Sequence, residues 1–264
     1  MKLNIVPART GLTWVQLGIR TFLRQPLAMA GQFFMFMAVV SVLSVVPLLG
    51  TAVALALVPA ATLGLMTASR EAHAGRFPMP VTLISAFREG PERMRAMLML
   101  GAAYAGALLL VVLLGSLFGA GGPPPASEAG EMTPEALRAA FDAGSLWPLL
   151  LLYLPVLAAF WHAPALVHWH GVSPVKSLFF SLMACWANKG AMLVFMAAWL
   201  VVIMGTGLVI SLIGGLFGGA AALQVIMYPM VLLLAAMFHT SIYFTFRDSF
   251  DNAEPAQTNP GEQA

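Results

Sequence analysis

Charged residues are scarce in this chain of 264 residues, since only 9% are Asp, Glu, Lys or Arg and 60% are hydrophobic. About a quarter of the residues in a soluble domain are charged, so the composition excludes an ordinary water-soluble domain. Cysteine is nearly absent: Cys185 stands alone, which excludes an intramolecular disulfide and a cysteine-based metal cage. The chain also lacks a basic patch with interleaved aromatics, and we expect no nucleic-acid partner.

Four long stretches contain no charged residue: 27–68, 96–127, 143–175 and 190–246. Each exceeds the roughly 20 apolar residues that cross a bilayer core. The first and the last are long enough for two crossings, with turns at "VPLLG" and "IGGLFGGA". We therefore predict an all-α polytopic membrane bundle of six transmembrane helices, at about 27–46, 50–69, 96–118, 147–168, 190–213 and 221–246.

The basic residues indicate how the chain is oriented, because Lys and Arg are retained on the cytoplasmic side of short loops. With the N-terminus inside, 12 of them lie in cytoplasmic segments and only Arg138 lies outside. We predict a multi-pass membrane protein with both termini cytoplasmic. Residues 1–26 form a cytoplasmic segment, 27–250 the transmembrane domain, 119–146 its external loop, and 251–264 a disordered tail.

Three segments before pairs of spans carry apolar residues at helical spacing: 10–26, 80–95 and 173–190. In the third, Ser173, Ser177, Ser181 and Asn188 lie opposite a face formed by Val175, Leu178, Phe179, Leu182, Met183 and Trp186. We interpret all three as amphipathic surface helices. The domain then consists of three repeats, each a surface helix followed by a helical hairpin.

A proline lies inside the returning span of every repeat, at Pro59, Pro155 and Pro229. Proline frees a backbone carbonyl one turn earlier and kinks the helix, which a bundle tolerates when neighbouring groups satisfy that carbonyl. Three kinked helices at matching positions are able to line a central cavity. The alternative is that membrane prolines and amphipathic helices are each common and imply no repeat.

The stretch "FWHAPALVHWHG" (160–171) raises the question of a metal site, but its histidines lack the i, i+3 or i, i+4 spacing that directs two imidazoles to one ion. Amphipathic rings are enriched where a helix leaves the membrane. We interpret six residues as interface anchors: Trp14, Trp161, His168, Trp169, His170 and Trp186. No metal or cofactor is expected.

His162 lies deeper, where an ionisable group is costly and marks a functional-site hypothesis. His239 is its expected partner, because it precedes Arg247 by eight residues as His162 precedes His170. Thr240 and Tyr243 supply nearby hydroxyls to this candidate intramembrane polar site. One hypothesis is a proton-titrating or ligand-gripping pair. The other is that each histidine is neutral and hydrogen-bonded to a backbone carbonyl.

No nucleophile has a base at suitable spacing, so nothing in the sequence favours an enzyme. The first hypothesis is a non-enzymatic membrane component that binds lipids or partner proteins, with its basic cytoplasmic rim against anionic headgroups. The second is a permease or channel for a small or amphipathic molecule, through a cavity lined by the second, fourth and sixth spans. A polar, water-accessible cavity containing His162 and His239 would favour the second hypothesis, and a filled apolar core the first.

Three motifs, "NIVPARTGLTWVQLGIRTFLRQPLAM", "FWHAPALVHWHGVSPVKSLFFSLMACWANKGA" and "SIYFTFRDSF", resemble an uncharacterised family of polytopic bacterial inner-membrane proteins. The resemblance covers most of the chain outside the external loop and the tail. It implies the location and the helical fold and adds no activity. The family pattern has an apolar aromatic where this chain has His162, which argues against a catalytic role for that residue.

The orientation is testable with cysteine labelling. In cells, a membrane-impermeant thiol reagent should label a cysteine placed at Glu131 and miss one placed at Ser173, because the first lies in the external loop and the second in a cytoplasmic segment. The reverse pattern would show that the chain is inverted in the membrane.

Overall fold

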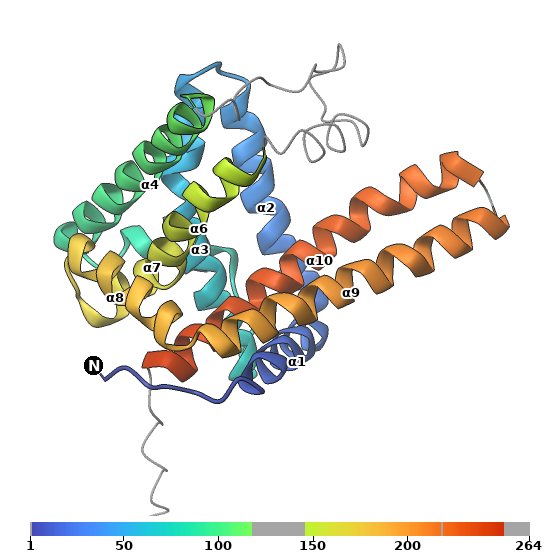
Figure 1. Ribbon diagram of the computed structural model, residues 1–264, viewed down its shortest axis with the longest axis horizontal. Coiled ribbons are helices and arrows are strands. Elements are labelled where there is room, and N and C mark those ends of the chain that lie inside the picture. The colour runs from blue at the N-terminus through green and yellow to red at the C-terminus, as the bar shows by residue number, and fades with distance from the viewer. Residues whose placement is uncertain (1, 118–145, 218, 251–264) are drawn as a thin grey trace, which may run out of the picture.

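The computed structural model describes residues 2–117, 146–217 and 219–250. All regular secondary structure in these residues is helical (Figure 1). Its helices, in order, are α1 (Thr10–Arg24), α2 (Pro26–Ser44), α3 (Leu49–His73), the 3₁₀ helix η1 (Pro80–Phe87), α4 (Pro91–Leu117), α6 (Leu146–Trp161), α7 (Ala163–His170), α8 (Pro174–Ala187), α9 (Lys189–Phe217) and α10 (Gly219–Phe250).

Six spans are long and apolar enough to cross a membrane: Pro26–Ser44, Leu49–His73, Pro91–Leu117, Trp147–His170, Lys189–Gly214 and Ile226–Phe250. The prediction of an all-α bundle with six transmembrane helices is confirmed, and the turn at 46–50 separates α2 from α3. Most of the external loop 119–146 and the tail 251–264 lie outside the described residues.

The order of the helices matches three units of a short helix and two spans: α1 before α2 and α3, η1 before α4 and α6–α7, and α8 before α9 and α10. The middle unit differs from the expectation of an α-helix over 80–95, because its short helix is 3₁₀ and covers only Pro80–Phe87. Proline starts this helix, and Gly90 with a φ of 101° precedes α4. Short connecting segments of this kind often take the tighter 3₁₀ form.

Helix α1 packs its apolar side against protein, chiefly α9 and α10. Trp14 is fully buried and its indole Nε1 donates to Asp248 Oδ2 at 2.8 Å. The close approach to α10 needs Gly18, since a Cβ there would overlap Ser241. The first surface helix is thereby part of the helical core, while Leu12 and Leu23 on its other sides are exposed.

The N-terminal segment before α1 crosses the ends of three other helices. Asn4 N donates to the carbonyl of Ser249 at 2.9 Å, and Val6 N donates to Asn188 Oδ1 at 2.8 Å. Asn188 Nδ2 donates in return to the carbonyl of Asn4 at 2.9 Å. The buried Asn188 side chain therefore joins the N-terminal segment to the junction of α8 and α9.

The α9–α10 hairpin reaches away from the other spans, whereas α2, α3, α4 and α6 stay together (Figure 1). Its base is packed, because α10 contacts α1 and α3. The rings of Phe195 and Trp199 on α9 also each contact Phe238 on α10, in tilted and T-shaped geometry. Farther along α9, Val201, Met204 and Leu208 are exposed. The bundle is thus closely packed at the end that holds α1 and α8 and open at the hairpin tip.

Packing of α1 on α10 is testable at Gly18. Gly18→Ala should destabilise the protein by about 1–3 kcal/mol, because the added methyl group must displace the backbone around Ser241. Gly31→Ala in α2 is the matched control, since a Cβ added there would meet nothing within 4 Å and alanine favours a helix. The measurement is the midpoint of thermal unfolding in detergent, and equal midpoints for the two variants would contradict the packing.

Candidate functional site

The fourth span is broken at His162, where α6 ends and α7 begins. Pro164 in the first turn of α7 has no N–H, so the regular ladder of the helix stops here. A side chain from α8 completes the hydrogen bonding: Ser181 Oγ accepts from His162 N at 2.9 Å and donates to the carbonyl of Ala158 at 2.7 Å. One hydroxyl thereby replaces the direct backbone bond between these two groups.

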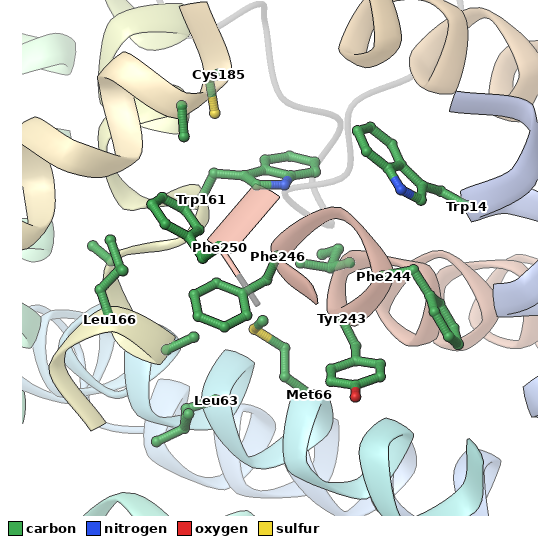
Figure 2. Close-up of a cluster of buried hydrophobic side chains, with 14 of the residues drawn as sticks. Trp14, Leu63, Met66, Trp161, Leu166, Cys185, Tyr243, Phe244, Phe246 and Phe250 are labelled. Carbon is green, nitrogen blue, oxygen red and sulfur yellow. The ribbon is translucent and has the colours of Figure 1, made fainter. Parts of the chain in front are cut away.

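His162 is 1% exposed and belongs to a filled core. Its Nε2 lies 3.2 Å from Thr245 Oγ1, which also accepts a bond of 3.0 Å from Trp161 Nε1. Its ring contacts Phe246 and Phe250 at centroid distances of 6.0 and 5.5 Å. Figure 2 shows these aromatic side chains gathered between α6 and α10. The surroundings of His162 are therefore those of a packed, hydrogen-bonded core residue.

Cys185 completes this cluster from α8 (Figure 2). Its Sγ lies 3.6 Å from the carbonyl of Ala158 and 3.9 Å from His162 Nδ1. Burial raises the pKa of the Cys185 thiol to about 12. The thiol consequently stays protonated at neutral pH, and it acts as a weak hydrogen-bond donor at the helix break.

His239 lines a different feature, a cavity of about 270 Å³ between α3, α4, α6 and α10. Its lining residues are Val58, Pro59, Thr62, Tyr104, Tyr153, Leu157, Phe160, Trp161, Phe238, His239 and Ile242. The second, fourth and sixth spans do meet at a cavity, together with the third. We call it the polar cavity, because four of its side chains carry a hydroxyl or an imidazole.

The predicted pair of histidines is not joined by a hydrogen bond or ring contact in the described part of the chain. His239 Nδ1 is 2.8 Å from the carbonyl of Ala235 on its own helix, and its ring stacks near Phe33. The Thr240 hydroxyl donates to the carbonyl of Ala236 at 2.8 Å, and Tyr243 packs against Trp169. The four residues proposed as one polar site therefore have separate neighbours.

The three prolines lie in helix interiors, as expected, but only Pro59 lines the polar cavity. Pro59 is buried, whereas Pro155 and Pro229 are exposed on the outer surface of their helices. Matching positions along the three returning spans therefore do not place the prolines around one axis.

The expected interface anchors occupy different environments. Trp14, Trp161 and His168 are buried, so their rings contact protein and not headgroups. Trp169 and His170 are partly exposed and pack against Phe246. Trp186 is 68% exposed, with Lys189 Nζ 5.1 Å from its ring centre.

An ionic cluster that the sequence did not reveal lies where α7 ends. His168 Nε2 is 3.2 Å from Glu89 Oε1, and Arg93 contacts both Glu89 and the carbonyl of Val167. Arg70 lies over the ring of Trp169. These residues come from α3, α4 and α7 and from the segment before α4, so only the tertiary structure brings them together.

Helix α8 faces the protein with its polar side. Ser177, Ser181, Ala184 and Cys185 are its buried residues, and the exposed ones include Val175, Phe179, Met183 and Trp186. Burial of the serine face follows from the hydrogen bonds that Ser181 makes to α6. Of the apolar face predicted from the sequence, Val175, Phe179, Met183 and Trp186 point away from the bundle. Leu178 and Leu182 are half-buried, and Leu178 packs against the core.

The structure has six apolar spans among its described residues, and no Asp or Glu is buried there. These features define a polytopic membrane protein. The chain is 35% identical over 266 residues to a probable inner membrane protein of Burkholderia thailandensis, and the match covers 97% of this chain and 96% of that protein. The chain belongs to the same family of inner-membrane proteins. No family model matches it, and no solved structure gives a significant match.

The hydroxyl at the helix break gives a test of this site. Ser181→Ala should destabilise the protein by about 1–3 kcal/mol, because His162 N loses its buried acceptor. Ser177→Ala is the control on the same helix, since that buried hydroxyl bonds only to the carbonyl of Pro174 in its own first turn. The free energy of unfolding in detergent is the quantity to compare. Equal losses in both variants would mean that Ser181 does not support the break.

Proposed function

We propose that the protein is a non-enzymatic inner-membrane component that binds anionic lipids at the cytoplasmic face, with α8 as its main contact. The observation that supports this proposal is the orientation of α8, whose apolar side is exposed and whose serine side is buried. An exposed row of Val175, Phe179, Met183 and Trp186 is favourable against acyl chains and costly against water. The bilayer is therefore the natural environment of this face.

Basic side chains at both ends of α8 add charge to the apolar face. Lys176 is exposed in the first turn, and Lys189 follows the helix directly, next to the exposed ring of Trp186. Such residues are attracted to anionic headgroups, at about 1 kcal/mol for each Lys or Arg near the surface. We place α8 and both termini on the cytoplasmic side, in accordance with the distribution of basic residues in the sequence. The exposed side of α9 is a second proposed contact surface, for partner proteins in the membrane.

A permease or channel is the second candidate function. One observation favours it: α3, α6 and α10, the three returning spans, meet at the polar cavity. The filled core around His162, which Trp161 connects to this cavity, favours binding over passage. A membrane component that holds ligands is therefore the stronger proposal.

Lipid binding can be tested by native mass spectrometry of protein released from nanodiscs that contain equal amounts of phosphatidylglycerol and phosphatidylcholine. Lys176→Gln should lower the relative affinity for phosphatidylglycerol about fivefold, because it removes one cation worth about 1 kcal/mol near the headgroups.

Arg76→Gln is the matched control, since it changes the net charge equally but its guanidinium is already paired with Glu71. The control should retain the preference of the native protein. Equal loss in both variants would indicate a general charge effect, and no loss in Lys176→Gln would contradict a headgroup site on α8.

A further inference from the structure

A second cavity adjoins the polar cavity and has a different lining. It has a volume of about 320 Å³, is lined by α3, α4 and α6, and is open on its outer side, where Leu109 and Val112 are 60% and 63% exposed. Its lining residues are Leu55, Leu108, Leu109, Val111, Val112, Leu149, Leu150 and Tyr153. We call it the apolar cavity. Tyr153 lines both cavities, so one side chain marks the place where the polar and the apolar surfaces meet.

We propose that the two cavities together bind a single-chain amphiphile with an uncharged, hydrogen-bonding head group. Their combined volume lies within the range of about 300–1,000 Å³ that is usual for small-molecule sites. The head group lies in the polar cavity and the hydrocarbon chain in the apolar cavity. No activity follows from binding alone, and the ligand can be a bound component as well as a transported one.

The polar cavity selects an uncharged head group. Thr62, Tyr104, Tyr153 and His239 supply its polar atoms, and no Asp, Glu, Lys or Arg is among its described lining residues. An ionised head would lose its hydration here without gaining a counter-charge, at a cost far above that for a hydroxyl or an ester. Phosphate and carboxylate heads are therefore disfavoured.

Both donors and acceptors are present for such a head. Tyr104 and Tyr153 both line the polar cavity, and each phenol hydroxyl is able to donate one hydrogen bond and to accept others. His239 Nδ1 donates to the carbonyl of Ala235, so Nε2 of the neutral ring is an acceptor. A hydroxyl-bearing head group suits this set of acceptors.

The apolar cavity selects the chain. Apart from Tyr153 its lining consists of Leu and Val side chains from α3, α4 and α6. A hydrocarbon chain there keeps apolar neighbours, as it has among the acyl chains of the bilayer, whereas a polar chain would lose its hydrogen bonds. The site is distinct from the face of α8, because it shares none of the residues that carry the proposed headgroup binding.

Photo-crosslinking with a monoacylglycerol that carries a diazirine near the end of its chain tests the site. The probe is added to the full chain in nanodiscs, and adducts are mapped by peptide mass spectrometry. Adducts are expected on the α4 and α6 residues that line the apolar cavity: Leu108, Leu109, Val111, Val112, Leu149, Leu150 and Tyr153. Tyr104→Phe combined with Tyr153→Phe should reduce this labelling about five- to tenfold at low probe concentration, because hydrogen bonds to the head group are lost.

Tyr228→Phe is the control, since Tyr228 is 72% exposed and lies outside both cavities. Competition in the native chain gives a second measurement that does not depend on a variant folding: excess monodecanoylglycerol should suppress the labelling, and decanoate should not. Three results would each overturn the proposal. The first is equal labelling of the exposed side of α9, the second is labelling of the same residues by a diazirine phosphatidylglycerol, and the third is suppression by decanoate. Lys176→Gln should leave the labelling unchanged, which separates this test from that of the headgroup site.

Discussion

A backbone N–H or C=O group inside the bilayer must find a partner within the protein, because lipid offers none. The break in the fourth span exposes this requirement most clearly. Ser181 reaches from α8 to bond both His162 N and the carbonyl of Ala158. The short helix α8 is thus joined by hydrogen bonds to a spanning helix. Its polar face is directed inward as a result, and its apolar face is left for the surroundings.

The same requirement organises the other short helix of the well-packed end. On α1, Trp14 donates to Asp248 of α10, and Asn4 bonds to the carbonyl of Ser249 near the end of that helix. Small residues let the helices approach closely enough for these bonds, as Gly18 does against α10. Polar contacts therefore concentrate where α1, α8 and α10 meet. The hairpin tip reaches away from the bundle.

Run lengths and turn residues were enough to predict the six spans and their order, because a bilayer sets the length of an apolar helix. The sequence did not predict which side of each helix faces the protein, because bilayer thickness sets the length of a span and not its rotation. His162 and His239 each lie eight residues before a basic or imidazole side chain, so the sequence pairs them. In the structure the helix is broken at His162, next to Pro164, and the two side chains have different neighbours. On α8, helical spacing separates polar from apolar residues correctly, but it does not say which side meets the protein. The partner of Ser181 is the freed carbonyl of Ala158, which is visible only in three dimensions.

The proposed headgroup site and the proposed amphiphile site are connected through α6. Ser181 of α8 bonds to Ala158, whose neighbours on α6, Leu157, Phe160 and Trp161, line the polar cavity. A displacement of α8 therefore moves the wall of that cavity or breaks a buried hydrogen bond. A lipid that binds the exposed face of α8 in this position breaks no such bond, so the cavity wall stays in place and the two proposed sites bind independently. Coupling between them would need a second arrangement of α8 that one of the ligands favours over the first.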